Sequence, residues 1–295
     1  MDVALLMLAG GVAAGIFGSL LGLGGGVLIV PLLTLGFGLD LRAAVGVSLV
    51  CVIMTSSAAA GVYLEKHVAN LRLGMSLELF TALGALIGGS IAFLVDERFL
   101  SGLFAALLGY VAFSMVRAAA QGRESVGAGE PNAGGAGENA GRGPEPEDIP
   151  VRDPTEPVDA RSTFLATVGG PGYEVRNPGR GVVGATGAGV ASALLGVGGG
   201  IIKVPLMHLA MGVPLRVATA TSNLMIGITA AASAVIYLLR GEIDPYVAGP
   251  TAIGVFLGAT IGSRASHRIG LRYLRLLFVV VLLYTAVQML LRAVA

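Results

Sequence analysis

A glycine-rich stretch that occurs twice constrains this chain more than any other feature. Residues 15–32 read GIFGSLLGLGGGVLIVPL, and residues 189–206 read GVASALLGVGGGIIKVPL. In each copy a helix of small apolar residues is expected to run into a glycine cluster and then into a short apolar segment with a proline. Gly196 follows Gly22 by 174 residues (196 − 22), and the same offset aligns the halves without a gap up to Tyr110. The chain therefore contains an internal duplication.

Apolar segments of membrane-crossing length fill both halves. The chain is 55% hydrophobic and 13% charged, whereas a soluble domain carries about 25% charged residues. We therefore predict an all-α polytopic membrane protein that is embedded in the lipid bilayer. The net charge of +1 gives no basic footprint, so no nucleic-acid partner is expected. The third apolar run, residues 73–95, carries glycines at the spacing of close helix packing, at Gly84, Gly88 and Gly89.

Between the halves the composition changes abruptly. From residue 119 to residue 180, Gly, Pro, Glu and Asp dominate and hydrophobic periodicity is lost, which is typical of disorder. We predict a first membrane repeat at 1–118, a cytoplasmic and largely disordered linker at 119–180, and a second membrane repeat at 181–295. The N-terminal residues lack the basic region of a signal peptide, so we expect the first apolar segment to stay in the mature protein.

The glycine-broken segments decide the topology. Residues 3–35 are too long for one crossing and short for two crossings plus a loop. If this segment crosses the membrane, each half has four crossings and the halves are parallel. If it is a re-entrant pair of helices, each half has three crossings and the halves are inverted.

Basic residues in short loops favour the cytoplasmic side, and they separate the two topologies. The basic segment 264–275 is placed inside. The re-entrant topology then also puts the linker, Lys66 and Arg72 inside, whereas the all-crossing topology puts them outside and moves Arg42 and Arg98 inside. We therefore predict two inverted repeats, each a glycine-broken re-entrant helix pair plus three transmembrane helices, with both termini outside. The basic residues left outside are Arg42, Arg98, Arg240 and Arg292.

The helices that restart after the glycine clusters are candidates for an anion site. Irregular backbone at membrane depth lines a wet cavity or is buried in protein. A helix N-terminus offers free N–H groups and about half a positive charge, and glycine lets a ligand approach the backbone. The alternative is that the glycines only permit close helix crossing. The candidate substrate-binding residues are Gly24, Gly25 and Gly26 in the first copy and Gly198, Gly199 and Gly200 in the second.

Neutral polar side chains in the next helix of each half extend this candidate site. Ser48, Ser222 and Asn223 could donate hydrogen bonds to an oxyanion, and hydrogen bonding between helices is the alternative. Ser192 and Ser19 follow as secondary candidates.

Two ionisable residues interrupt apolar segments. Lys203 stands where the first half has Ile29. It either lends positive charge to the anion path or snorkels to the cytoplasmic face. Glu78 stands where the second half has Ala252. It either couples transport to protons or lies at the membrane interface, and we expect the interface.

Catalytic and cofactor motifs are missing from the sequence. There is no phosphate-binding loop, no nucleophile elbow around a serine, and no clustered His, Cys and Asp of metal-ligand spacing. We therefore expect neither an enzyme nor a bound cofactor or metal.

The doubled motif Leu-Leu-Gly-(Leu/Val)-Gly-Gly-Gly-x-x-x-Val-Pro-Leu and the later Ala-Thr-Ser-Asn run ending at Asn223 resemble the sulfite exporter TauE/SafE family, also called the toluene-sulfonate uptake permease group. The first half departs from the pattern, because Leu49 stands opposite Asn223. The resemblance implies a multi-pass protein of the inner cell membrane that exports small sulfur-containing anions such as sulfite or organosulfonates. The anion would bind near the midplane between the two broken-helix tips, with alternating access.

Two other functions stay open beside transport. One is a passive anion channel with the same site, and the other is a non-transporting membrane scaffold or sensor. The expected partners are a small anionic substrate and the bilayer, with a homodimer as a possible assembly.

Overall fold

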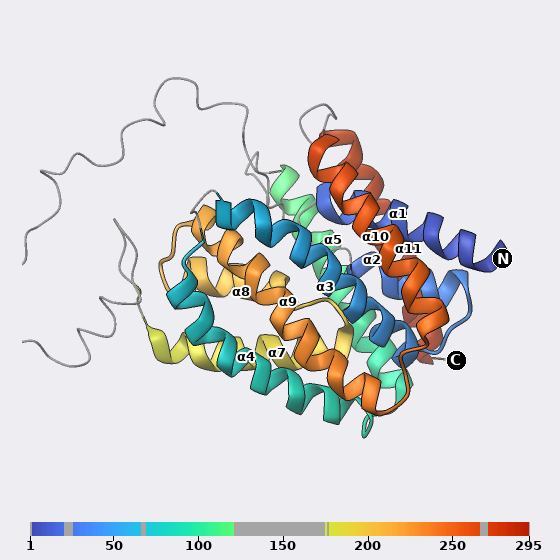
Figure 1. Cartoon of the computed structure of the whole chain (residues 1–295), viewed down its shortest axis with the longest axis horizontal. Helices are drawn as coiled ribbons and strands as arrows, with labels where there is room; N and C mark the ends of the chain where they lie inside the picture. Colours follow the sequence, from blue (N-terminus) through green and yellow to red (C-terminus); the bar gives the residue numbers. More distant parts are fainter. Residues whose placement is uncertain are drawn as a thin grey trace, which may run out of the picture.

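The computed structural model describes residues 2–20, 26–65, 69–120, 175, 177–265 and 271–294. Within these ranges the chain is helical and has no strand (Figure 1). The predicted linker lies almost wholly outside them, so its disorder stays a prediction. The elements of the first half are α1 (Asp2–Leu20), α2 (Gly26–Pro31), the π-helical turn η1 (Leu32–Gly36), α3 (Leu41–Glu65), α4 (Leu71–Ala92) and α5 (Glu97–Ala120).

The second half repeats this order of elements. They are α7 (Pro178–Leu195), α8 (Gly200–Pro205), the π-helical turn η3 (Leu206–Ala210), α9 (Leu215–Leu239), α10 (Pro245–Ala265) and α11 (Leu271–Val294). The bounds of α8, η3, α9 and α11 are those of α2, η1, α3 and α5 shifted by 174 residues. The duplication seen in the sequence is therefore also a duplication of helices.

The two halves exchange helices. The first helix of each half packs on a helix of the other half. Thus α1 lies on α10, and α7 lies on α4. The central helices α3 and α9 pack on each other, and α5 packs on α11. In Figure 1, α1, α10 and α11 gather on the right-hand side of the view and α4 and α7 on the left, with α3 and α9 between them.

Glycine brings the exchanged helices into backbone contact. A Cβ atom on Gly84 would lie 2.2 Å from the carbonyl oxygen of Thr186, and one on Gly88 would lie 2.6 Å from Val190 Cα. The same holds on the other side, where a Cβ on Gly258 would lie 2.1 Å from the carbonyl oxygen of Val12. The packing role predicted for Gly84 and Gly88 is thereby confirmed, since a larger residue would separate the helices.

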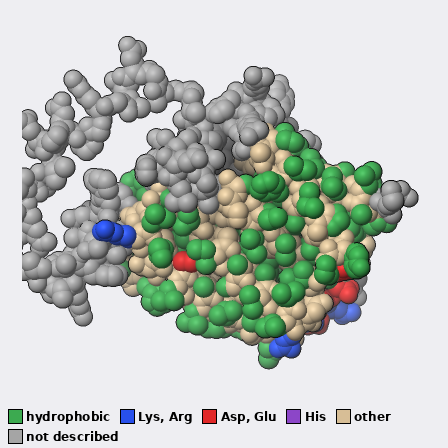
Figure 2. All heavy atoms as spheres, viewed as in Figure 1, with side chains coloured by type: hydrophobic (Ala, Val, Ile, Leu, Met, Phe, Trp, Pro, Cys, Tyr) green, Lys and Arg blue, Asp and Glu red, His purple; other side chains and the backbone are tan. Residues whose placement is uncertain are grey.

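The outer surface is that of a membrane protein. Five of the described helices are long and apolar enough to cross a bilayer. Large apolar side chains point outward along them, such as Leu79 on α4, which is 71% exposed. Figure 2 shows a face dominated by hydrophobic side chains and interrupted by few charges. Such a surface is solvated well only by lipid, and the chain is a multi-pass membrane protein. The predicted spans lie in 41–58, 71–92, 97–117, 217–239 and 245–262.

Candidate functional site

The second glycine cluster is a sharp turn between α7 and α8. Gly196, Gly198 and Gly199 have φ angles of 68°, 77° and 74°. These values lie in the left-handed region, where a side chain costs about 1–2 kcal/mol per residue. Gly199 is the N-cap of α8, and no side chain caps this helix. The first N–H donors of α8 therefore have no side-chain cap, and those of Ile202 and Lys203 donate to the carbonyl oxygen of Gly199.

The first glycine cluster is described only at its end. Gly24 and Gly25 lie outside the described residues, and Gly26 begins α2. Gly26 lies against the second turn, because a Cβ atom there would be 2.6 Å from the carbonyl oxygen of Gly196. Ser48 of α3 joins the two, and its Oγ lies 2.8 Å from the carbonyl oxygen of Gly196 and 3.3 Å from that of Gly26. Two segments far apart in the sequence thus meet at the centre of the protein.

The serines around the turn differ in their hydrogen bonding. The hydroxyl of Ser48 donates its proton to a backbone carbonyl. This is the hydrogen bonding between segments of the protein that was the alternative to anion binding. Ser192 of α7 and Ser222 of α9 are each 1% exposed, and their hydroxyls have no hydrogen-bond partner within the described part of the chain. A buried hydroxyl without a partner calls for an explanation, such as an unseen water or ion.

Both unpartnered hydroxyls border the glycine turn. A Cβ atom on Gly200 would lie 3.8 Å from Ser222 Oγ, and one on Gly199 would lie 3.3 Å from Ser192 Cβ. Two hydroxyls without partners in the described part of the chain therefore lie beside the turn. This arrangement is complementary to an anion.

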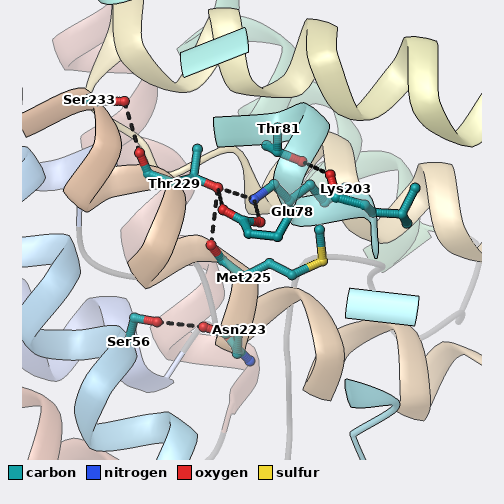
Figure 3. Close-up of polar contacts among 9 residues, drawn as sticks. Ser56, Glu78, Thr81, Lys203, Asn223, Met225, Thr229 and Ser233 are labelled. Atoms are coloured by element: carbon teal, nitrogen blue, oxygen red, sulfur yellow. Dashed lines mark hydrogen bonds and ion pairs between the residues drawn. The ribbon is translucent and has the colours of Figure 1, made fainter. Parts of the chain in front are cut away.

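Asn223 lies at the contact between the two central helices. Its backbone carbonyl accepts a hydrogen bond from Ser56 Oγ at 2.5 Å, and its side chain is half-buried. Figure 3 shows Asn223 beside Ser56, apart from the charged residues. Ser56, which the sequence pattern did not single out, therefore ties α3 to α9.

Lys203 and Glu78 form a buried ion pair. Lys203 of α8 is 1% exposed and Glu78 of α4 is 4% exposed, and Lys203 Nζ lies 3.2 Å from Glu78 Oε2. Lys203 Nζ also donates to Thr229 Oγ1 at 2.5 Å, and Thr229 Oγ1 donates to Glu78 Oε1 at 2.6 Å. The three side chains point toward one another in a closed ring (Figure 3).

This ion pair corrects the interfacial position expected for Glu78 and contradicts snorkelling of Lys203, while the role of Lys203 in an anion path stays a prediction. Lys203 does not snorkel, because its ammonium ends on a carboxylate inside the helix bundle. A lone charge at this depth would cost several kcal/mol, and pairing offsets that cost.

The other half has no such ion pair. Under the 174-residue offset, Ile29 takes the place of Lys203 and Ala252 that of Glu78, and both are buried. Only Thr229 has a hydroxyl counterpart, Thr55. The sequence held the signal for this pair, since two opposite charges stood in apolar segments at positions where the other half is apolar. Buried charges are almost always paired, so this pattern predicts that Glu78 and Lys203 pair with each other.

Known proteins place this chain in a family. A family model described as sulfite exporter TauE/SafE matches residues 7–289. The chain is also 24% identical to the probable membrane transporter protein YunE of Bacillus subtilis (strain 168), over 95% of this chain and 94% of that protein. No solved structure matches it. With its helical bundle, apolar surface and doubled glycine-rich motif, the chain belongs to the sulfite exporter TauE/SafE family of membrane transporters.

Proposed function

We propose that this protein exports small sulfur-containing anions, such as sulfite or organosulfonates, by alternating access. The anion binds at the second glycine turn, between Ser192, Ser222 and the start of α8. The observation that carries this proposal is the pair of buried hydroxyls without partners beside that turn. Export is the direction named in the description of the family.

The site needs a re-entrant segment, and contacts at the two ends of the helix bundle support one. Asn177, just before α7, donates from Nδ2 to the carbonyl oxygen of Ala210, the last residue of η3, at 3.5 Å. The segment from α7 to η3 thus starts and finishes at the same end of the bundle. A segment that crossed the membrane would finish at the opposite end.

Two arginines give independent support for inverted halves. The guanidinium carbons of Arg42 and Arg240 lie 5.7 Å and 5.1 Å from the centre of the Phe93 ring. The start of α3, the end of α4 and the end of α9 therefore share one end of the bundle. The re-entrant topology puts both arginines on the outer face, whereas the all-crossing topology puts them on opposite faces. In this proposal both termini are outside and the linker is cytoplasmic.

The glycine turn suits an anion whose charge is spread over several oxygens. Sulfite and sulfonates present three oxygens, each of which accepts hydrogen bonds. The hydroxyls of Ser192 and Ser222 and the first N–H groups of α8 supply neutral donors. Lys203 lies within the first turn of the same helix, where its N–H bonds to the carbonyl oxygen of Gly199. Lys203 therefore supplies, on the same helix, a positive charge that favours an anion over a neutral solute.

A ligand screen followed by a flux assay tests the proposed function. Purified protein is heated with sulfite, thiosulfate, sulfoacetate, taurine or sulfate. A ligand at 100 times its Kd stabilises the folded protein by about 2.7 kcal/mol. We expect the sulfur oxyanions to raise the unfolding temperature, and we expect saturable counterflow of radiolabelled sulfite in proteoliposomes. Linear flux without saturation would instead indicate a channel, and no stabilisation together with no flux would refute transport of these anions.

A further inference from the structure

We propose that the Glu78–Lys203–Thr229 cluster couples anion transport to a proton, with Glu78 as the proton carrier. This inference rests on the proposed function, because it concerns the path of the same anion. Ser222 and Thr229 are seven residues apart on α9 (229 − 222), which is about two turns and places them on one face. The anion that leaves the serine hydroxyls therefore meets Lys203 next along this face.

At Lys203 the anion competes with the Glu78 carboxylate for the ammonium group. The ammonium is already held by the carboxylate of Glu78 at 3.2 Å, so the anion takes the place of that carboxylate. Lys203 keeps its position during this exchange, because Nζ still donates to Thr229 Oγ1. The hydroxyl proton of Thr229 has a second acceptor in the carbonyl oxygen of Met225 at 3.0 Å. The hydroxyl of Thr229 therefore still has a hydrogen-bond acceptor when Glu78 leaves.

The charge balance of the buried cluster then requires a proton. The paired cluster is neutral, with one ammonium and one carboxylate, and an added anion would give it a net negative charge in a medium of low dielectric. Lys203 is the ion-pair partner that the described residues give Glu78, so an anion that takes Lys203 deprives the Glu78 carboxylate of this cation. The faces of α7 and α9 that pack on α4 present Gly189, Thr221 and Met225.

Protonation of Glu78 restores neutrality. The step takes a Glu78 carboxylate paired with the Lys203 ammonium, one anion and one proton from water, and gives a neutral Glu78 carboxyl group and an anion paired with that ammonium. Two covalent bonds change: one O–H bond of a hydronium ion breaks, and the O–H bond of Glu78 forms. The loaded and empty proteins then carry the same charge in this cluster. Transport is electroneutral symport of anion and proton, so export from an alkaline interior requires an outward anion gradient that exceeds the opposing pH gradient.

Proton uptake on anion binding is the direct test. Methanesulfonate suits it, because its sulfonate stays ionised across the working pH range. We expect wild-type protein in weakly buffered detergent solution to take up one proton for each methanesulfonate bound, measured with a pH indicator dye. Glu78→Gln should bind methanesulfonate without proton uptake. Glu97→Gln, the same chemical change at the first residue of α5, should behave as wild type.

A flux assay gives the second measurement. Wild-type proteoliposomes with an alkaline interior should accumulate methanesulfonate against its gradient. Glu78→Gln should lose this accumulation and keep exchange of internal for external methanesulfonate. Binding by the wild type with no proton uptake would overturn the coupling even if Glu78→Gln failed to fold. No binding or flux of either methanesulfonate or sulfite by the wild type would instead overturn the proposed function and the coupling with it.

Discussion

Removing the hydroxyl of Ser222 should separate a binding role from a structural one. A hydroxyl that hydrogen-bonds within the protein stabilises the folded state. A buried hydroxyl that bonds only to a ligand destabilises the ligand-free protein, because it is unsatisfied there. Ser222 Oγ is buried and has no hydrogen-bond partner among the described residues. We therefore expect Ser222→Ala to leave the anion-free protein at least as stable as wild type and to weaken anion binding.

The structure sets the size of both effects. An unsatisfied buried hydroxyl costs about 1–3 kcal/mol, so the free energy of unfolding without anion should be unchanged or higher by up to about 3 kcal/mol. A hydrogen bond to an ionised acceptor contributes about 1.5–3 kcal/mol. Its loss should raise the Kd for sulfite by roughly 10- to 150-fold.

The assay measures both quantities on the same protein. Calorimetric titration with sulfite gives the Kd, and unfolding by SDS in mixed micelles gives the free energy of unfolding without anion. Ser233→Ala is the matched control, since Ser233 is buried on the same helix and donates to the carbonyl oxygen of Thr229 at 3.0 Å. It should leave the Kd unchanged. Destabilisation of Ser222→Ala with an unchanged Kd would refute the assignment of this hydroxyl to the anion.

Three further sets of substitutions test the geometry. Lys203→Ile and Glu78→Gln should each destabilise the protein by about 3–5 kcal/mol because they leave a buried charge unpaired, and the double variant should recover most of this loss, measured as a double-mutant cycle in SDS unfolding. Gly199→Ala should lower the free energy of unfolding by about 1–3 kcal/mol because its φ is 74°. A Cβ atom on Gly200 would meet the end of the Ile226 side chain at 2.5 Å and lie 3.8 Å from Ser222 Oγ, so Gly200→Ala should crowd the space beside this hydroxyl and weaken sulfite binding in calorimetry. Ser48→Ala should destabilise the protein by about 1–3 kcal/mol in the same unfolding assay, because it leaves a buried carbonyl without its donor.

Each of these has a clear contrary result. Additive losses in the cycle would mean that Lys203 and Glu78 do not interact in the folded protein. Equal stability of the two glycine variants would contradict the left-handed turn at Gly199. A Ser48→Ala protein as stable as wild type, with weaker sulfite binding, would move Ser48 from the structural role to the anion site.

Much of the helical framework could be predicted from sequence because its causes are local. Apolar runs of bilayer-crossing length predict helices, since only a helix satisfies its own backbone in lipid. The 174-residue offset recurs in the bounds of α2 and α8 and of α3 and α9. Glycine spacing predicted close packing of α4, because the absence of a side chain acts wherever a partner helix lies.

The candidate site was predicted only in part, because hydrogen bonding depends on which helices become neighbours. Ser48 and Ser222 occupy equivalent positions in the two halves, yet one hydroxyl bonds to the carbonyl oxygen of Gly196 and the other has no partner in the described part of the chain. The residues around the two serines differ, as at Leu49 and Asn223. Which backbone carbonyl each hydroxyl reaches depends on segments that are distant in the sequence, such as the glycine turn beside Ser48.

The sequence by itself determined a duplicated, helical membrane protein with glycine-broken segments, because hydrophobicity, length and glycine content act through the backbone alone. Only the tertiary structure decided that Glu78 and Lys203, 125 residues apart, form one buried cluster. Two charges in separate apolar segments are each unfavourable, and their placement has low energy only when α4, α8 and α9 pack together and bring them within hydrogen-bonding distance. The two halves therefore differ in that this packing forms an ion pair from Glu78 and Lys203, where their counterparts Ala252 and Ile29 are apolar.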